Sequence, residues 1–177
     1  MDNRLRGEGL SGSGRVSLVV VDEDILRHLV AVAVADADAD EVTPPLTPGR
    51  EWTAERRNWL LDYHRTRRAG LDGPHREATW AIVCDGAPVG SVRLQATGAD
   101  GELEAGIWVA RSARGRRIAH EAMRELLVLA NRLGATRVRA DTAVDNVAAQ
   151  RLMRSIGFEI LTPVGGRVHA EAVVSNS

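Results

Sequence analysis

The arginine-rich segment at residues 114–119 has the chemistry to bind a pyrophosphate. It follows a predicted strand and opens a long predicted helix, so the first backbone N–H groups of the helix and several guanidinium groups meet there. A solvated basic turn before a helix has the same composition, so the segment alone leaves both interpretations open. Its residues are Arg114, Gly115, Arg116, Arg117, Ile118 and Ala119.

A second motif runs from Asn146 (NVAAQRL) to Gly157-Phe158. The asparagine precedes a predicted helix at residues 146–155, where its side chain can cap the helix by accepting a hydrogen bond from a backbone N–H. An ordinary N-cap explains this pattern locally. The same side chain can also bond the amide of a ligand, or a bound water, at the mouth of the helix.

Together the two motifs resemble the coenzyme A site of the GNAT N-acetyltransferase superfamily, most closely the branch that acetylates protein N-termini, ribosomal proteins included. The family's pyrophosphate loop begins with Arg or Gln and ends with Gly or Ala, and Arg114 and Ala119 fill these places. The family's Asn…Gly-Phe spacing is intact. The resemblance implies the GNAT fold, an α/β domain with a mixed sheet, and an enzyme that uses acetyl-CoA and no metal.

The resemblance also implies which residues bind each part of the coenzyme. The turn binds the pyrophosphate, the strand at residues 103–109 pairs with pantetheine, and Asn146 steadies the reactive end. The N–H of Val109 polarises the thioester carbonyl and holds the developing oxyanion, while Trp108 shapes the acyl pocket or packs in the core. The implied coenzyme-binding residues are Ile107, Trp108, Val109, Arg114, Gly115, Arg116, Arg117, Ile118, Ala119, Asn146 and Arg151.

The acceptor amine must lose a proton before it attacks, because an α-amine with a pKa of about 8 is mostly protonated at pH 7, and a carboxylate can take that proton. Strand alternation puts Glu102 and Glu104 on one face. Similar enzymes open a V-shaped split between two parallel strands near the position of Glu104. We therefore expect Glu104 to take the proton, directly or through water; the alternative is a surface carboxylate on a strand.

Two positions depart from the family pattern. Arg117 stands where the family usually has glycine, and Met153 stands where many members have a tyrosine that protonates the departing thiolate. The only tyrosine is Tyr63, in the predicted helix at residues 52–68. These departures leave the general acid unassigned, and they favour the alternative of a catalytically degenerate acyl-CoA-binding sensor. The acceptor, a peptide N-terminus or a small amine, has no readable motif.

The elements that must position these residues follow from hydrophobic periodicity and turn chemistry. The predicted order is β-α-α-β-β-β-α-β-α-β-β, which describes one α/β domain over residues 15–177 after a flexible arm at residues 1–14. The clearest helix is at residues 116–133 and ends at Gly134. The last two strands are predicted at residues 158–164 and 167–174.

Two charged segments have no assigned role. The alternating tract ADADADE, which ends at Glu41, is interpreted as a solvated helix end or loop, and a metal site there is disfavoured because no glycine turn accompanies it. The predicted helix at residues 52–68 has a basic face that either attracts an acidic partner or is solvated. Its arginines are Arg56, Arg57, Arg65, Arg67 and Arg68.

Composition narrows the function classes. Lys and Arg total 23, all of them arginine, against 24 acidic residues, so the net charge of −1 argues against a nucleic-acid binder. Cys84 is the only cysteine and is expected to be a buried thiol in a cytoplasmic protein. The five histidines share no metal-ligand spacing, so no metal is expected. No segment reads as a signal peptide or membrane span, and the resemblance allows a homodimer.

Overall fold

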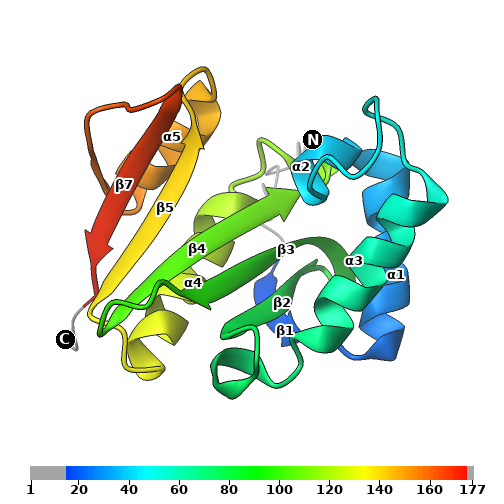
Figure 1. Cartoon of the computed structure of the whole chain (residues 1–177), viewed down its shortest axis with the longest axis horizontal. Helices are drawn as coiled ribbons and strands as arrows, with labels where there is room; N and C mark the ends of the chain where they lie inside the picture. Colours follow the sequence, from blue (N-terminus) through cyan, green and yellow to red (C-terminus); the bar gives the residue numbers. More distant parts are fainter. Residues whose placement is uncertain (1–14, 175–177) are drawn as a thin grey trace, which may run out of the picture.

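Seven strands form one mixed sheet in the computed structural model of the protein, which describes residues 15–174 (Figure 1). The strand order in the sheet is β1-β2-β3-β4-β5-β7-β6. Neighbouring strands are antiparallel except β4 and β5, which are parallel. The strands are β1 Val16–Val20, β2 Glu77–Cys84, β3 Ala87–Ala96, β4 Glu102–Val109, β5 Arg137–Ala143, β6 Glu159–Ile160 and β7 Arg167–Val173.

Helices cover both faces of this sheet. Leu26 and Leu29 of α1 pack on one face against Ala81 of β2, and the wide apolar stripe of α4, which includes Leu126, packs on the other. Asp22 caps α1 by accepting a hydrogen bond from the Ile25 amide at 2.8 Å. The helices are α1 Glu23–Asp36, α2 Ala39–Val42, α3 Ala54–Thr66, α4 Ile118–Arg132 and α5 Val147–Ser155, with 3-10 turns η1 Gly70–Asp72 and η2 Arg111–Ala113.

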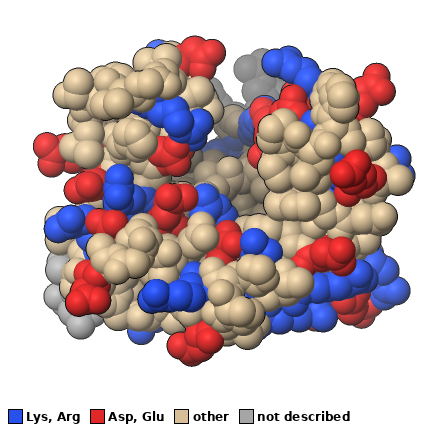
Figure 2. Space-filling model, viewed as in Figure 1, with Lys and Arg blue, Asp and Glu red and all other residues tan. Residues whose placement is uncertain are grey.

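The sheet opens between its two parallel strands. β4 and β5 pair only through Glu102↔Arg137, Leu103↔Val138 and Glu104↔Arg139, and beyond these residues the strands diverge (Figure 1). The space-filling view shows a hollow over the wide end of this split, with acidic and basic side chains interspersed around it (Figure 2). From Ala105 onward, β4 therefore has an edge that no strand pairs, where another extended chain can bind.

The predicted fold class is confirmed, and two predicted elements need correction. The strand expected at residues 158–164 is only Glu159–Ile160, because Pro163 follows and has no N–H for a ladder. The acidic tract holds a separate one-turn helix, α2. The predicted hairpin at Asp85-Gly86 is present, with φ of 52° and 83° at its two central residues. The arm predicted at residues 1–14 lies outside the described residues.

The acidic tract is more than the solvated helix end or loop that the sequence predicts, because it pairs with η2, directly before the arginine-rich turn. Asp38 accepts a hydrogen bond from Arg111 Nη1 at 2.9 Å, and Asp36 accepts one from the Ser112 amide at 3.0 Å. Hydrogen bonding to Ser112 holds the pKa of Asp36 below its ordinary value. The tract therefore fixes the N-terminal helices against the turn, more than 70 residues further along the chain.

The basic face predicted on α3 is solvated in part, since Arg57, Arg65 and Arg68 are exposed, and most of its arginines also form contacts within the molecule. Arg56 is fully buried and donates to Asp40 Oδ1 at 2.7 Å and to Gly49 O at 2.9 Å, which fixes the proline-rich loop at residues 43–50 that precedes α3. Arg65 and Arg68 both donate to Glu23 on α1. These contacts neutralise most of the face.

The cysteine, the helices and the potential metal ligands can be compared with the expectations from the sequence. Cys84 is buried in β2, as predicted. Across residues 15–174, the helices are all too short or too polar to cross a membrane. Within the same part of the chain, no three His, Cys, Asp or Glu side chains are grouped so that they could hold a metal ion.

Candidate functional site

Two cavities meet at the split between β4 and β5. The turn cavity, about 920 Å³, is lined by the arginine-rich turn, the end of β4 and α5. The α3 cavity, about 560 Å³, is lined by α3, β2, β3 and β5. Both volumes are ordinary for small-molecule sites. The residues that line both cavities are Glu41, Ile107, Trp108, Asp141, Thr142, Asn146, Ala149, Leu152 and Arg167.

The arginine-rich turn presents open backbone amides at the start of α4. Arg117 occupies the N-cap position with φ 61° and ψ 6°, and its side chain makes no capping hydrogen bond. An arginine side chain has no acceptor atom, so the N-cap residue leaves the first amides of the helix unbonded, and the helix dipole favours an anion beside them. The left-handed conformation of Arg117 is one that glycine adopts at lower energy, so this departure from the family pattern places strain in the turn.

Arg114 lies between the turn and the acidic tract. Its Nε donates to Val109 O at 3.1 Å, and its Nη2 donates to Glu41 Oε2 at 2.6 Å. Glu41 comes from α2, so the carboxylate of one element already binds the arginine that we predict to hold phosphate. An incoming phosphate must share this guanidinium with Glu41 or displace the carboxylate from it.

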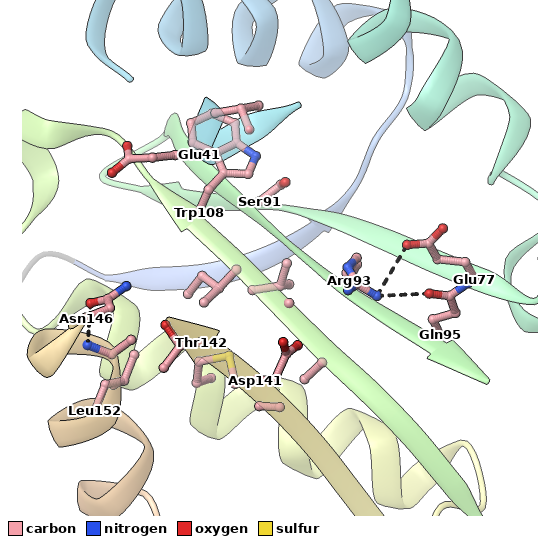
Figure 3. A pocket seen from close by; sticks show the side chains of 18 of the residues that line it. Glu41, Glu77, Ser91, Arg93, Gln95, Trp108, Asp141, Thr142, Asn146 and Leu152 are labelled. Atoms are coloured by element: carbon pink, nitrogen blue, oxygen red, sulfur yellow. Dashed lines mark hydrogen bonds and ion pairs between the residues drawn. The ribbon is translucent and has the colours of Figure 1, made fainter. Parts of the chain in front are cut away.

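The structure brings the predicted coenzyme-binding residues together with one exception. All of them line the turn cavity except Arg116, whose guanidinium points to the β2–β3 hairpin and lies 3.7 Å from Asp85 Oδ2. Asn146 caps α5 as expected, accepting a hydrogen bond from the Ala149 amide at 3.1 Å (Figure 3). It also lines both cavities, so the two roles considered for it are geometrically compatible.

The end of β4 points its peptide groups into the split. The Ala110 amide donates to Val89 O on the β3 side at 2.8 Å, and successive peptide groups of a strand point in opposite directions. The carbonyl of Val109, bonded by Arg114, faces the other side. The Val109 N–H therefore faces the split, where the predicted oxyanion would lie.

A buried charge network closes one end of the α3 cavity. Glu77 is 3% exposed and accepts hydrogen bonds from Tyr63 Oη at 2.7 Å and from Arg67 Nε. Arg93 Nη1 lies 3.7 Å from the same carboxylate (Figure 3). Burial, together with the hydrogen bond to Glu77, raises the pKa of Tyr63, so its phenol stays protonated in this network.

Arg93 also fixes Glu104, the carboxylate predicted to take the amine proton. Arg93 Nη2 donates to Glu104 Oε1 at 2.6 Å, and Nη1 donates to Gln95 at 3.2 Å. A Cβ on Gly106 would lie 2.6 Å from Arg93 Nε, so the glycine lets this arginine cross β4. Glu104 lines neither cavity, because it sits at the narrow end of the split and is bound by Arg93. Its role stays a prediction.

His64 supplies a neutral imidazole to the wall of the α3 cavity. Its Nδ1 lies 2.9 Å from Thr79 Oγ1, and burial lowers its pKa to about 4. Its Nε2 is buried and has no hydrogen-bond partner among the described residues. Beside it, Trp59 and Tyr63 stack with ring centroids 4.9 Å apart, which gives this cavity an aromatic wall.

Sequence reasoning missed the side chains that come from distant elements. Glu77, Asp141 and Arg167 all line the α3 cavity, yet none belongs to a motif, and Glu41 was singled out only as the end of the acidic tract. The alternation of buried and half-buried residues along β5 gave a signal for Asp141, because it puts Asp141 on the face opposite the core residue Ala140. Nothing local indicated that this face borders a cavity.

Comparisons with known proteins agree with this fold and identify the family. The model of the family described as Acetyltransferase (GNAT) domain matches residues 15–159. The GNAT domain of S. lividans PAT is 20% identical, with a TM-score of 0.67 and 90% of each chain covered. RimL, a ribosomal L7/L12 alpha-N-protein acetyltransferase solved in complex with coenzyme A, is 17% identical, with a TM-score of 0.67 and coverage of 90% of this chain and 94% of its own. An N-acetyltransferase from Staphylococcus aureus Mu50 is 18% identical, with a TM-score of 0.66 and coverage of 91% and 99%. A comparison with curated protein sequences gives no match.

Proposed function

The chain belongs to the GNAT family of N-acetyltransferases, and from this premise we propose that it transfers the acetyl group of acetyl-CoA to a primary amine by direct attack on the thioester. One observation carries the proposal: two cavities meet at the split between β4 and β5, and one of them begins at the arginine-rich turn. The coenzyme occupies the turn cavity and the amine occupies the α3 cavity.

The coenzyme is held by the turn, the strand edge and α5. Amides at the start of α4 and the guanidinium of Arg114 bind the pyrophosphate. The free edge of β4 at Ile107 and Val109 pairs with pantetheine as a neighbouring strand would. Asn146, which caps α5, and Arg151 of α5 also bind the coenzyme. Every contact in this scheme uses a residue that lines the turn cavity.

The reaction makes one bond and breaks one. The lone pair of the neutral amine attacks the thioester carbon, forming the N–C bond, and the carbonyl electrons move to oxygen beside the Val109 N–H. Collapse of this adduct breaks the C–S bond and releases the thiolate, which takes a proton from solvent. The amine proton goes to a carboxylate on the acceptor face of the split. Glu104 is the carboxylate that the sequence predicts for this step.

The acceptor is a peptide N-terminus or a small primary amine. The α3 cavity has an aromatic wall at Trp59 and Trp108 and carries charges of both signs, which suits a short polar chain rather than an apolar one. RimL, named for an N-terminal protein substrate, supports the peptide. The size of the cavity, about 560 Å³, fits only the end of such a peptide.

Calorimetric titration with acetyl-CoA tests the coenzyme half. We expect micromolar binding that weakens at least tenfold in both Asn146→Ala and Arg114→Ala. Arg154→Ala on α5 is the matched control, because Arg154 is exposed and lines neither cavity. Equal binding by all four proteins would contradict the coenzyme site.

Mass spectrometry of products tests the acceptor half. The panel contains peptides with free α-amino groups, spermidine and free amino acids, each incubated with acetyl-CoA. We expect one acetyl group on the amine of at least one class. Coenzyme binding without product on any panel member would contradict the enzyme and favour the acyl-CoA-binding sensor instead.

A further inference from the structure

The amine must lose its proton where the two cavities meet, because the thioester and the amine can touch only there. Among the carboxylates of residues 15–174, Glu41 and Asp141 alone line both cavities. Glu41 is bonded to Arg114 at 2.6 Å, so it belongs to the phosphate end of the turn cavity. Asp141 is on β5, across the split from the unpaired edge of β4.

Asp141 lies further into the open split than Glu104 does. Glu104 pairs with Arg139 in the last residue pair that joins the two strands, and Asp141 is two residues beyond Arg139, about 6–7 Å towards the wide end. Figure 3 shows Asp141 projecting from β5 into the cavity below Trp108. Glu104, bound by Arg93, lines neither cavity.

One oxygen of Asp141 is fixed and the other is open. Both Nε and Nη2 of Arg167, on β7, contact Asp141 Oδ2. Oδ1 accepts no hydrogen bond from any residue in the described part of the chain. The side chain is 28% exposed. A carboxylate held in one orientation by a neighbouring strand, with a free oxygen at the junction, has the geometry of a proton acceptor.

We propose that Asp141 Oδ1 receives the proton of the acceptor amine as the N–C bond forms, and that Arg167 is its positioning residue. This inference rests on the proposed function. Asp141 first binds the ammonium form as its counter-charge. One proton then passes to Oδ1, directly or through one water, and the nitrogen lone pair that this frees forms the new bond to carbon. The nitrogen of the adduct loses its second proton to solvent as the C–S bond breaks. The proton on Oδ1 returns to solvent after the product leaves.

The test compares kcat and the coenzyme Kd in Asp141→Asn, Glu104→Gln and the wild type, using the panel amine acetylated fastest. Asp100→Asn is the control, because Asp100 is exposed in the β3–β4 turn. General-base removal lowers kcat about 10²–10⁴-fold, so we expect Asp141→Asn to lose at least tenfold more kcat than Glu104→Gln, with the acetyl-CoA Kd changed less than about threefold.

A smaller difference between the two variants, or a loss of coenzyme binding in Asp141→Asn, overturns the assignment. The readout for Arg167 is the comparison of kcat with the acetyl-CoA Kd, together with rescue by the conservative variant. Arg167→Gln should lower kcat while the acetyl-CoA Kd stays near that of the wild type, and Arg167→Lys should recover part of the loss. Wild-type protein that binds acetyl-CoA yet acetylates no panel amine refutes the proposed function itself, and this role with it.

Discussion

Glu41→Gln is expected to tighten coenzyme A binding, because it frees the arginine that phosphate needs. In the structure Glu41 Oε2 accepts a hydrogen bond from Arg114 Nη2 at 2.6 Å. If the pyrophosphate displaces this carboxylate, the energy of the ion pair is subtracted from the energy of binding. The glutamine keeps the size of the side chain and removes its charge, so the variant isolates that contribution.

The expected magnitude follows from how exposed the pair is. The side chains of Arg114 and Glu41 are 46% and 42% exposed, and pairs of this kind contribute about 0.2–1 kcal/mol. Since about 1.4 kcal/mol is tenfold in affinity, the gain should be about 1.4- to 5-fold. Salt screens exposed charges, so the gain should shrink as the ionic strength rises from about 0.05 M to about 0.5 M.

Calorimetric titration with coenzyme A at both ionic strengths measures this gain. Glu55→Gln is the matched control, because Glu55 lies exposed in the first turn of α3 and lines neither cavity. Adding Glu41→Gln to the Arg114→Ala variant should produce no gain, because the partner is already absent. Pantetheine, which has no phosphate, should bind equally to the wild type and Glu41→Gln.

The reasoning is refuted if Glu41→Gln binds coenzyme A more weakly than the wild type does. In that case Glu41 orients Arg114 for the phosphate instead of competing with it. An equal gain in the Arg114→Ala background would refute it as well, because the effect would then come from the general charge of the acidic tract and not from this pair.

Three further predictions test the turn, the imidazole and the floor of the α3 cavity. Arg117→Gly should stabilise the protein by about 0.5–1 kcal/mol in urea unfolding. The change relieves about 1–2 kcal/mol of left-handed strain, which exceeds the free-energy cost of giving the unfolded chain a more flexible glycine. Arg116→Gly should not stabilise the protein, because φ at Arg116 is not positive. His64 has a folded pKa of about 4 against an unfolded value near 6.5, so protons favour the unfolded chain and stability falls as the pH drops through this window. The loss of unfolding free energy between pH 7 and pH 4 should be on the order of 3 kcal/mol larger in the wild type than in His64→Gln. Parallel profiles of unfolding free energy against pH for the two proteins would contradict this prediction. Gly106→Ala should push Arg93 aside and raise the acceptor KM several-fold while the coenzyme Kd stays constant; a change in Kd alone would contradict this placement.

The coenzyme half could be predicted from the sequence because it is local. Strand, turn and helix follow one another from β4 to α5, and the amides that face a phosphate belong to the start of a helix, which periodicity and caps reveal. Asn146 was recognisable by its place before a helical pattern. The strain at Arg117 was not, because φ is set by the turn and not by the residue type.

The acceptor half could not be predicted, because its residues meet only through the register of the sheet. Glu104 and Asp141 have similar local patterns, since each is a half-buried strand residue between two buried neighbours. Only the pairing of β4 with β5, which ends at Glu104, separates a carboxylate in the closed part of the sheet from one in the open split. Likewise, the burial of Arg56 depends on a loop that folds back over α3.

The two halves also differ in how freely they can change. The Arg114–Glu41 pair beside the phosphate site is half-exposed, so breaking it alters affinity by a small factor and leaves the fold intact. The α3 cavity instead ends in Glu77, a residue that is 3% exposed and whose carboxylate is bound by Tyr63 and Arg67. Removal of one partner leaves a buried charge uncompensated, which costs about 3–5 kcal/mol. A change of acceptor through this network therefore requires two compensating substitutions, whereas a change at Trp59, which is uncharged and stacks on Tyr63, requires only one.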